Sequence, residues 1–283
     1  MSKIALVTDS TVSMPQELVD KYEIIVAPQV LIWGNETLED GVDISPNQFY
    51  TRLAKASVMP STSQVTVAKF LEIYQPLLDQ DYQILTILVS TKLSGTVNSA
   101  VQAKAMLPAG APIEIIDSNS VAMAMGFHLL TVARAIKQGA TLADCVALAQ
   151  KATEHTGIFF AVDTLEFLHR GGRIGGATRF LGTLLNFKPI LELRDGRVEP
   201  AERVRTRRKS LSRIVELAVE QIGTRTPIRL ASLHANAPED AKIVLDEASQ
   251  KLNPLETYLS EVSPVIGANA GPAVIGLVYM AGM

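Results

Sequence analysis

Two hydroxyl-rich segments of this 283-residue chain carry the side chains best suited to bind a small anion. Residues 61–64 read Ser-Thr-Ser-Gln, and residues 90–96 read Ser-Thr-Lys-Leu-Ser-Gly-Thr directly after an apolar run. A stretch with the pattern of a helix follows each segment. Hydroxyls beside the free backbone N–H groups at the start of a helix can bind an anion. Because no catalytic base adjoins either segment in the sequence, the pattern favours holding an acidic headgroup over cleaving a substrate.

Helix capping is the alternative explanation of the same hydroxyls. A Ser or Thr at the N-cap stabilises a helix by about 1 kcal/mol, which is enough to account for a single hydroxyl. Ser94 would then cap a helix over residues 96–106, and Thr62 or Ser63 would cap the helix that follows the first segment. Capping does not explain why Ser61, Thr62 and Ser63 occur together. If both segments are strand-end loops of one sheet, their pairing slightly favours a role in ligand binding. Helix capping remains the alternative.

The first half of the chain repeats a short apolar run, a polar turn and an amphipathic stretch, which predicts the elements that position these hydroxyls. The apolar runs are residues 4–10, 84–89 and 113–118. Alternation of strands and helices favours a parallel sheet covered by helices. Ligands of such sheets bind beyond the carboxyl ends of the strands, where Asp9, Ser90 and Asp117 fall.

The second half predicts strands of mixed direction together with helices. Residues 190–193 and 198–204 are strand-like and flank Arg-Asp-Gly-Arg at positions 194–197, which is a hairpin signal. Residues 267–272 contain glycines and a proline and predict a turn between the last strands.

These patterns together predict an α/β protein of two domains. Residues 1–156 are expected to form an N-terminal α/β domain with a parallel sheet flanked by helices, including a small irregular strand-and-turn insertion at about 24–50. Residues 157–283 are expected to form a C-terminal α+β domain with a mixed sheet. With 47% hydrophobic and 19% charged residues, the chain can bury a sizeable core.

Composition and missing motifs exclude several function classes. A formal net charge of −3 argues against a general nucleic-acid binder, and the single cysteine, Cys145, fits a reducing cytoplasm. The sequence has no signal-peptide pattern and no apolar stretch long enough to span a bilayer, so we expect a cytoplasmic protein whose membrane contact is transient and superficial. It also lacks Rossmann, P-loop, serine-hydrolase and His-Glu-x-x-His motifs, so no cofactor and no metal is expected.

A basic run follows the predicted hairpin. Arg203, Arg205 and Arg207 alternate, with Arg208 and Lys209 beside them. Alternate residues of a strand share one face, and three guanidinium groups on one face repel unless they are solvated or meet an anion. A solvated basic face and a contact with an acidic partner or ligand are about equally supported.

The motifs in their order along the chain resemble the DegV family of bacterial fatty-acid-binding proteins. The resemblance is carried by Val-Thr-Asp-Ser-Thr at 7–11, Thr-Ser-Gln at 62–64, Leu-Ser-Gly-Thr at 93–96, Asp-Ser at 117–118, Val-Asp-Thr-Leu-Glu-Phe-Leu-His-Arg-Gly-Gly-Arg-Ile at 162–174, Lys-Pro-Ile-Leu at 188–191, Val-Arg-Thr-Arg at 204–207 and Gly-Pro at 271–272. Each piece alone is weak, but the full set spans nearly the whole chain and is specific.

The resemblance implies a two-domain α/β protein with a long-chain fatty acid buried between or beside its domains. It implies that Thr62 and Ser94 hydrogen-bond the fatty-acid carboxylate and that Arg205 lies near this headgroup. It further implies that the bound acid is presented to a separate ATP-dependent fatty acid kinase, which makes an acyl phosphate for phospholipid synthesis. Asn269 stands where the family usually has a histidine, and an amide can donate a hydrogen bond but cannot become cationic.

Three functions therefore remain as hypotheses. The leading one is a non-catalytic fatty-acid carrier with Thr62, Ser94, Arg205 and Asn269 at the headgroup. The second is a phosphotransferase-like enzyme related to the dihydroxyacetone-kinase fold, in which aspartates at strand ends hold a metal or act as a base. These aspartates are Asp9, Asp117 and Asp163. The third is an interaction module that uses the basic residues 203–209.

Overall fold

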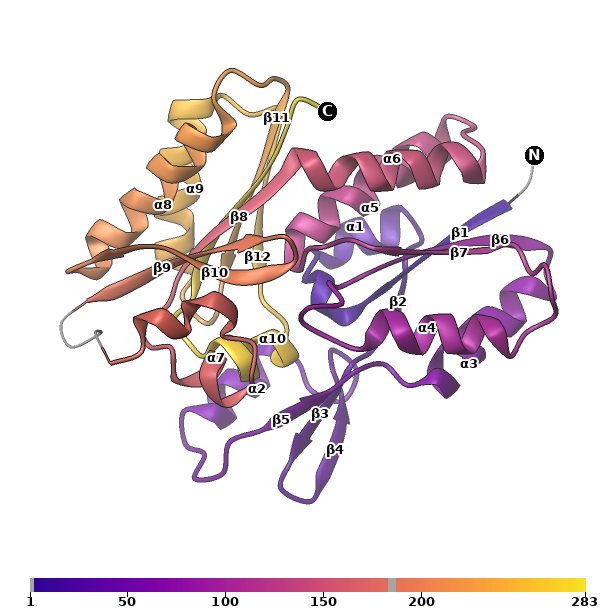
Figure 1. Ribbon diagram of the computed structural model, residues 1–283, viewed down its shortest axis with the longest axis horizontal. Helices are drawn as coiled ribbons and strands as arrows, with labels where there is room; N and C mark the ends of the chain where they lie inside the picture. The colour runs from indigo at the N-terminus through magenta and orange to yellow at the C-terminus, as the bar shows by residue number, and fades with distance from the viewer. Residues whose placement is uncertain (1–2, 183–186) are drawn as a thin grey trace.

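The computed structural model describes residues 3–182 and 187–283, and these residues form three β-sheets. The first is a parallel sheet with strand order β2-β1-β6-β7 (Figure 1). Its strands are β1 (Lys3–Asp9), β2 (Ile25–Ala27), β6 (Tyr82–Leu88) and β7 (Ile113–Asp117). The helices of this half are α1 (Gln16–Lys21), α3 (Val67–Leu78), α4 (Thr96–Ala105), α5 (Ala122–Lys137) and α6 (Leu142–His155), with a short 3-10 turn, η1 (Ser10–Val12).

Helices cover both faces of the parallel sheet because its strands are apolar on both sides. Val7 and Ile84 pack with side chains of α3 and α4, whereas Leu6 and Leu85 pack with side chains of α5 and α6. Successive strand residues point to opposite faces, so neighbouring residues of one strand belong to different layers. This sheet confirms the parallel arrangement predicted for the first half.

The second sheet has six strands in the order β10-β9-β8-β13-β11-β12, and only the β11–β12 pair is parallel. The strands are β8 (Thr156–Ala161), β9 (Lys188–Arg194), β10 (Arg197–Val204), β11 (Ile228–His234), β12 (Glu256–Glu261) and β13 (Ile275–Ala281). Helices α8 (Arg207–Ile222) and α9 (Pro238–Leu252) lie on its outer face (Figure 1). Its inner face, which includes Phe160 and Leu233, is turned toward the N-terminal half.

A small third sheet and four short helical segments connect the two larger layers. The sheet has the order β4-β3-β5, with β3 (Val30–Trp33), β4 (Glu36–Glu39) and β5 (Ser61–Ser63). The helical segments are α2 (Pro46–Leu53), α7 (Glu166–Arg170), η2 (Gly175–Phe180) and α10 (Pro264–Ala270). Helix α10 contacts α2, α7 and β5, so the C-terminal part of the chain meets the insertion predicted near residues 24–50.

The predicted fold class is confirmed, with a parallel sheet flanked by helices and a mixed sheet in the C-terminal part. The boundary between the expected domains falls at the start of β8, at Thr156. Helices α5 and α6 contact strands of both large sheets, so the division of the chain at residue 156 stays a prediction. None of the described helices is both long and apolar enough to cross a membrane.

Three local predictions were wrong. Residues 267–272 are not a turn between strands, because α10 continues through Ala270. Thr62 does not follow a strand of the parallel sheet; it lies in β5 and pairs with Leu31 of β3. The alternating arginines do not share one strand face, because β10 ends at Val204 and α8 begins at Arg207.

Candidate functional site

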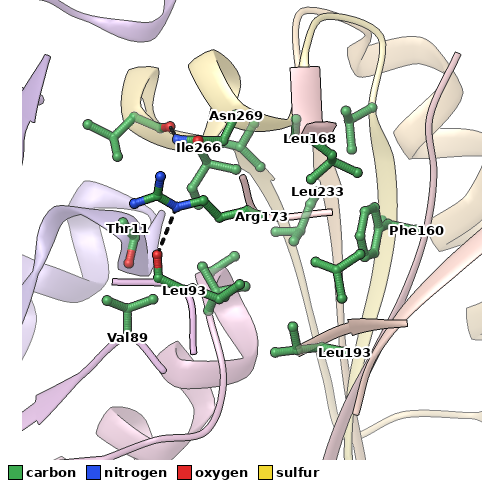
Figure 2. Close-up of a pocket in the computed structure, with 18 of the residues that line it drawn as sticks. Thr11, Val89, Leu93, Phe160, Leu168, Arg173, Leu193, Leu233, Ile266 and Asn269 are labelled. Atoms are coloured by element: carbon green, nitrogen blue, oxygen red, sulfur yellow. Dashed lines mark hydrogen bonds between the residues drawn. The ribbon is translucent and has the colours of Figure 1, made fainter. Parts of the chain in front are cut away.

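A cavity of about 860 Å³, including its open mouth, lies between the inner face of the six-stranded sheet and the loops that follow the parallel strands. In Figure 2, Leu233 and Phe160 line one side, and Leu93 and Val89 face them from the N-terminal half. Because most of the lining side chains are apolar, the cavity suits a hydrophobic ligand.

Asn269 and Thr62 place polar groups on the lining of this cavity. The carboxamide Nδ2 of Asn269 donates hydrogen bonds to Thr62 Oγ1 at 3.2 Å and to the carbonyl of Val265 at 2.9 Å. Since Thr62 accepts in this contact, its own hydroxyl hydrogen can be donated to a ligand. The side chain of Asn269 also packs directly against Gly171, where a Cβ atom would lie 2.3 Å from Asn269 Oδ1.

Ser94 supplies a second hydroxyl to the cavity lining. Its Oγ accepts from the backbone N–H of Thr96 at 3.3 Å and lies 2.9 Å from the Thr96 hydroxyl. When the Thr96 hydroxyl donates in that contact, the Ser94 hydrogen is available to a ligand. Ser94 therefore satisfies one N–H at the start of α4 and still faces the cavity.

The capping explanation does not account for Thr62. The N-cap of α3 is Thr66, whose side chain accepts from the backbone N–H of Lys69, and Thr62 lies in a strand four residues earlier. The N-cap residue of α4 is Gly95, which has no side chain to cap with. The cap of α3 was expected at Thr62 or Ser63, which is too early in the chain. Several hydroxyl residues precede α3, and the sequence alone does not show at which of them the helix begins.

Gln64 holds the two hydroxyl segments together. Its Nε2 donates to Ser99 Oγ on α4 at 2.8 Å, and its Oε1 occupies the space above Gly95, where a Cβ would lie only 2.0 Å away. Gln64 is two residues from Thr62, and Gly95 adjoins Ser94. The side chain of Gln64 thus joins the two segments through one packed contact.

Arg173 brings a positive charge to the same cavity. Its Nε donates to the carbonyl of Leu93 at 3.0 Å (Figure 2). A second guanidinium nitrogen donates to the carbonyl of Gly171. These bonds join the loop after α7 to the loop that carries Ser94. In the sequence, Arg173 appears only in the Gly-Gly-Arg part of the motif at 162–174, and that motif was the available signal for its place at the cavity.

Comparison with known proteins agrees with this architecture. The family described as "Uncharacterised protein, DegV family" matches residues 3–282. The chain belongs to the DegV family. A DegV domain-containing protein of Streptomyces coelicolor is 35% identical over 277 residues, which cover 97% of each chain.

Solved structures of two DegV family proteins share the whole fold. The protein from Thermus thermophilus, described as fatty acid binding, is 31% identical with a TM-score of 0.93 over 99% of each chain. DegV from Bacillus subtilis, described as a fatty acid binding protein, is 33% identical with a TM-score of 0.90 over 99% of this chain and 100% of that chain.

The fourth residue that the DegV resemblance assigned to the headgroup lies elsewhere. Arg205 is exposed and does not line the cavity, whereas Thr62, Ser94 and Asn269 do. The nearby Arg207 forms an ion pair within the protein, in which its Nε donates to Asp240 at 2.6 Å. The structure therefore brings together three of the four predicted residues and adds Arg173 to them.

The aspartates considered for a phosphotransferase-like enzyme related to the dihydroxyacetone-kinase fold are each engaged in other contacts. Asp9 is fully buried and accepts from the backbone N–H of Val89 at 2.9 Å; burial raises the pKa of its carboxyl, although its hydrogen bonds oppose this. Asp117 accepts from the Thr91 hydroxyl at 2.6 Å, and Asp163 pairs with Lys188 at 2.9 Å. Within residues 3–182 and 187–283, no group of three or more His, Cys, Asp or Glu side chains could hold a metal ion.

Proposed function

We propose that this DegV family protein binds a long-chain fatty acid in the cavity between its two large sheets. The supporting observation is that a single cavity combines an apolar wall with hydroxyl, amide and guanidinium donors at Thr62, Ser94, Asn269 and Arg173. Each buried methylene of an acyl chain contributes about 0.8 kcal/mol before the costs of binding. A carboxylate leaving water needs several donors or an opposite charge, and these four residues supply both.

The proposed orientation of the fatty acid follows from the different exposure of the two ends of the cavity. Thr62 and Ser94 are half-buried, whereas Phe160 and Leu233 on the sheet are buried. In our proposal the carboxylate lies at the accessible hydroxyl end and the acyl chain extends along the buried sheet face. None of the residues of this site is assigned a catalytic role.

We further propose that the bound acid serves a separate ATP-dependent fatty acid kinase in the cytoplasm. A carboxylate oxygen of the acid would attack the terminal phosphorus of ATP on the kinase, the bond to the bridging oxygen would break, and ADP would leave. The product is an acyl phosphate for phospholipid synthesis. The accessible position of the hydroxyl end supports this proposal, because the partner must reach the carboxylate.

Native mass spectrometry and direct titration test the lipid proposal. The purified protein should carry a long-chain acid, and the stripped protein should bind labelled palmitate with a stoichiometry of about one, because the proposal places one acid in one cavity. Protein that is recovered empty and also fails to bind labelled palmitate would overturn the proposal.

A further inference from the structure

The apolar cavity shares part of its wall with a second, largely polar pocket. Ile158 and Leu193 line both spaces. The remaining walls of the second pocket come from the loop after β7, the junction of α6 and β8, and the β9–β10 hairpin. These residues are Ser118, Asn119, Ser120, Thr153, Thr156, Gly157, Arg194 and Asp195.

The shared wall lies at the far end of the cavity from the proposed headgroup site. Figure 2 places Asn269 and Leu193 at opposite ends of the cavity. Leu193 is half-buried, and Arg194 and Asp195 directly after it are exposed in the hairpin turn. A single layer of side chains therefore separates the apolar space from the polar one.

The second pocket offers hydrogen-bonding groups that the described protein leaves unused. The side-chain amide of Asn119, which is exposed, and the hydroxyl of the half-buried Thr153 have no hydrogen-bond partner among the residues that the structure describes, so both are accessible to a ligand. The charges nearby leave an excess carboxylate, since Arg194 pairs with Glu192 and Asp195 adds a second negative charge to the rim. Such a mixed lining fits a neutral hydroxyl, which both donates and accepts, better than a second carboxylate.

We propose that this pocket is a subsite for a polar group at the far end of the acyl chain, so that the ligands of this protein include ω-hydroxylated long-chain fatty acids. The inference rests on the proposed function. A hydroxyl buried in a purely apolar cavity loses its water partners without replacement. Here a chain of sufficient length carries the hydroxyl past Leu193 to Asn119 and Thr153.

Matched pairs of acids test the subsite. Competition against labelled palmitate compares dodecanoic with 12-hydroxydodecanoic acid and hexadecanoic with 16-hydroxyhexadecanoic acid, and the series continues to the corresponding 20-carbon pair. We expect the hydroxyl to weaken binding about tenfold in the short pair, where it stays among apolar side chains, and less than about threefold in a longer pair. A penalty of about tenfold or more at every length would overturn the inference. Failure of the unsubstituted acids to bind would instead overturn the proposed function.

Two variants connect this length dependence to the second pocket. Asn119→Gly removes the amide and keeps the left-handed backbone, since Asn119 has a φ of 48° that glycine adopts freely. In the pair of acids for which the wild type shows the smallest hydroxyl penalty, this variant should lower the affinity of the hydroxylated acid relative to the unsubstituted acid about fivefold. That is the scale of one lost hydrogen bond. Asn253→Gly is the matched control, because Asn253 has a φ of 45° at the end of α9 and lines neither pocket.

Leu193→Phe places a larger side chain between the apolar cavity and the polar pocket and should block the passage of the acyl chain. The hydroxyl penalty should then return in the longer pairs of acids. If both Asn119→Gly and Leu193→Phe leave the affinity ratio unchanged, the hydroxyl does not reach this pocket and the inference fails.

Discussion

Asn269 donates a hydrogen bond to Thr62 across 3.2 Å, although the two residues are 207 positions apart in the sequence. The bond joins α10 to β5 and makes the Thr62 oxygen an acceptor toward the protein. The hydroxyl hydrogen of Thr62 then remains available for donation to a ligand, as the proposed fatty-acid site requires.

The paired hydroxyls should carry much of the headgroup affinity. We expect Thr62→Ala combined with Ser94→Ala to weaken palmitate binding by about 3 kcal/mol, or about a hundredfold, because two hydrogen bonds to a charged group are lost. Titration with labelled palmitate measures the effect. Ser63→Ala is the control, since Ser63 lies beside Thr62 in β5 but is exposed and outside the cavity lining. Wild-type affinity in the double variant would place the carboxylate elsewhere.

Charge at position 269 tests whether this side chain faces the ligand carboxylate. Asn269→Ala removes one donor and should cost about 1 kcal/mol of binding free energy. Asn269→Asp sets a second carboxylate against the first, so its loss of affinity should be at least about tenfold larger than that of Asn269→Ala. Both variants are compared by palmitate titration after thermal unfolding has shown that they are folded. Equal losses in the two variants would contradict a position beside the headgroup.

Arg173 and Arg205 offer competing positions for the headgroup cation. Arg173 lines the cavity, and Arg205 is exposed outside it. We expect Arg173→Ala to weaken fatty-acid binding by about 2 kcal/mol, the scale of a charge-assisted hydrogen bond, and Arg205→Ala to change it by less than about 0.5 kcal/mol. The reverse pattern in calorimetric titration would favour the position implied by the family resemblance.

The exposed basic residues near the start of α8 should contribute to kinase docking. Arg205 and Arg208 are exposed, whereas Arg207 pairs with Asp240 and Asp163 and is a poor choice for a surface test. We expect Arg205→Glu with Arg208→Glu to slow acyl-phosphate formation by an added fatty acid kinase about tenfold or more, because charge complementarity steers association. Palmitate affinity is measured in parallel. The control is Lys242→Glu, an exposed reversal on α9, and equal kinase rates in both variants would argue against docking at α8.

Asp40 should make the stability of the protein depend on pH. It is buried and accepts from the Ser10 hydroxyl at 2.6 Å, and burial raises the pKa of its carboxyl from 3.8 to about 6. The folded protein therefore binds this proton more tightly than the unfolded chain. Its contribution to the free energy of unfolding is greatest below about pH 4 and falls by about 3 kcal/mol as the pH rises through 6.

Asp40→Asn removes this titration. Relative to the wild type, its free energy of unfolding should rise by up to about 3 kcal/mol at pH 7 to 8 and change little below about pH 4. Urea unfolding at a series of pH values measures the difference. Asp43→Asn is the control for loss of an exposed carboxylate in the same loop. A difference between Asp40→Asn and the wild type that stays constant with pH would contradict the prediction.

Local sequence patterns are enough to predict the secondary-structure elements and their alternation. Helix α9 spans Pro238–Leu252 because a proline begins it, acidic residues fill its first turn and Asn253 ends it in the left-handed conformation. The hairpin at Asp195 and Gly196 was predicted for a similar reason, since its turn residues adopt positive φ. Such features depend on neighbouring residues and are legible in one sequence.

Which side chains share the cavity depends on contacts between segments that are distant in the sequence. Residues 267–270 belong to helix α10, although their glycine favours a turn. The glycine is needed for packing, because a Cβ at Gly267 would lie 2.6 Å from the Tyr50 hydroxyl of α2. That packing brings Asn269 to Thr62, and the Gly171 carbonyl helps to fix Arg173. Arg205, which follows the end of β10, is exposed and lies outside the cavity lining. These outcomes depend on contacts between distant segments, which local sequence patterns do not encode.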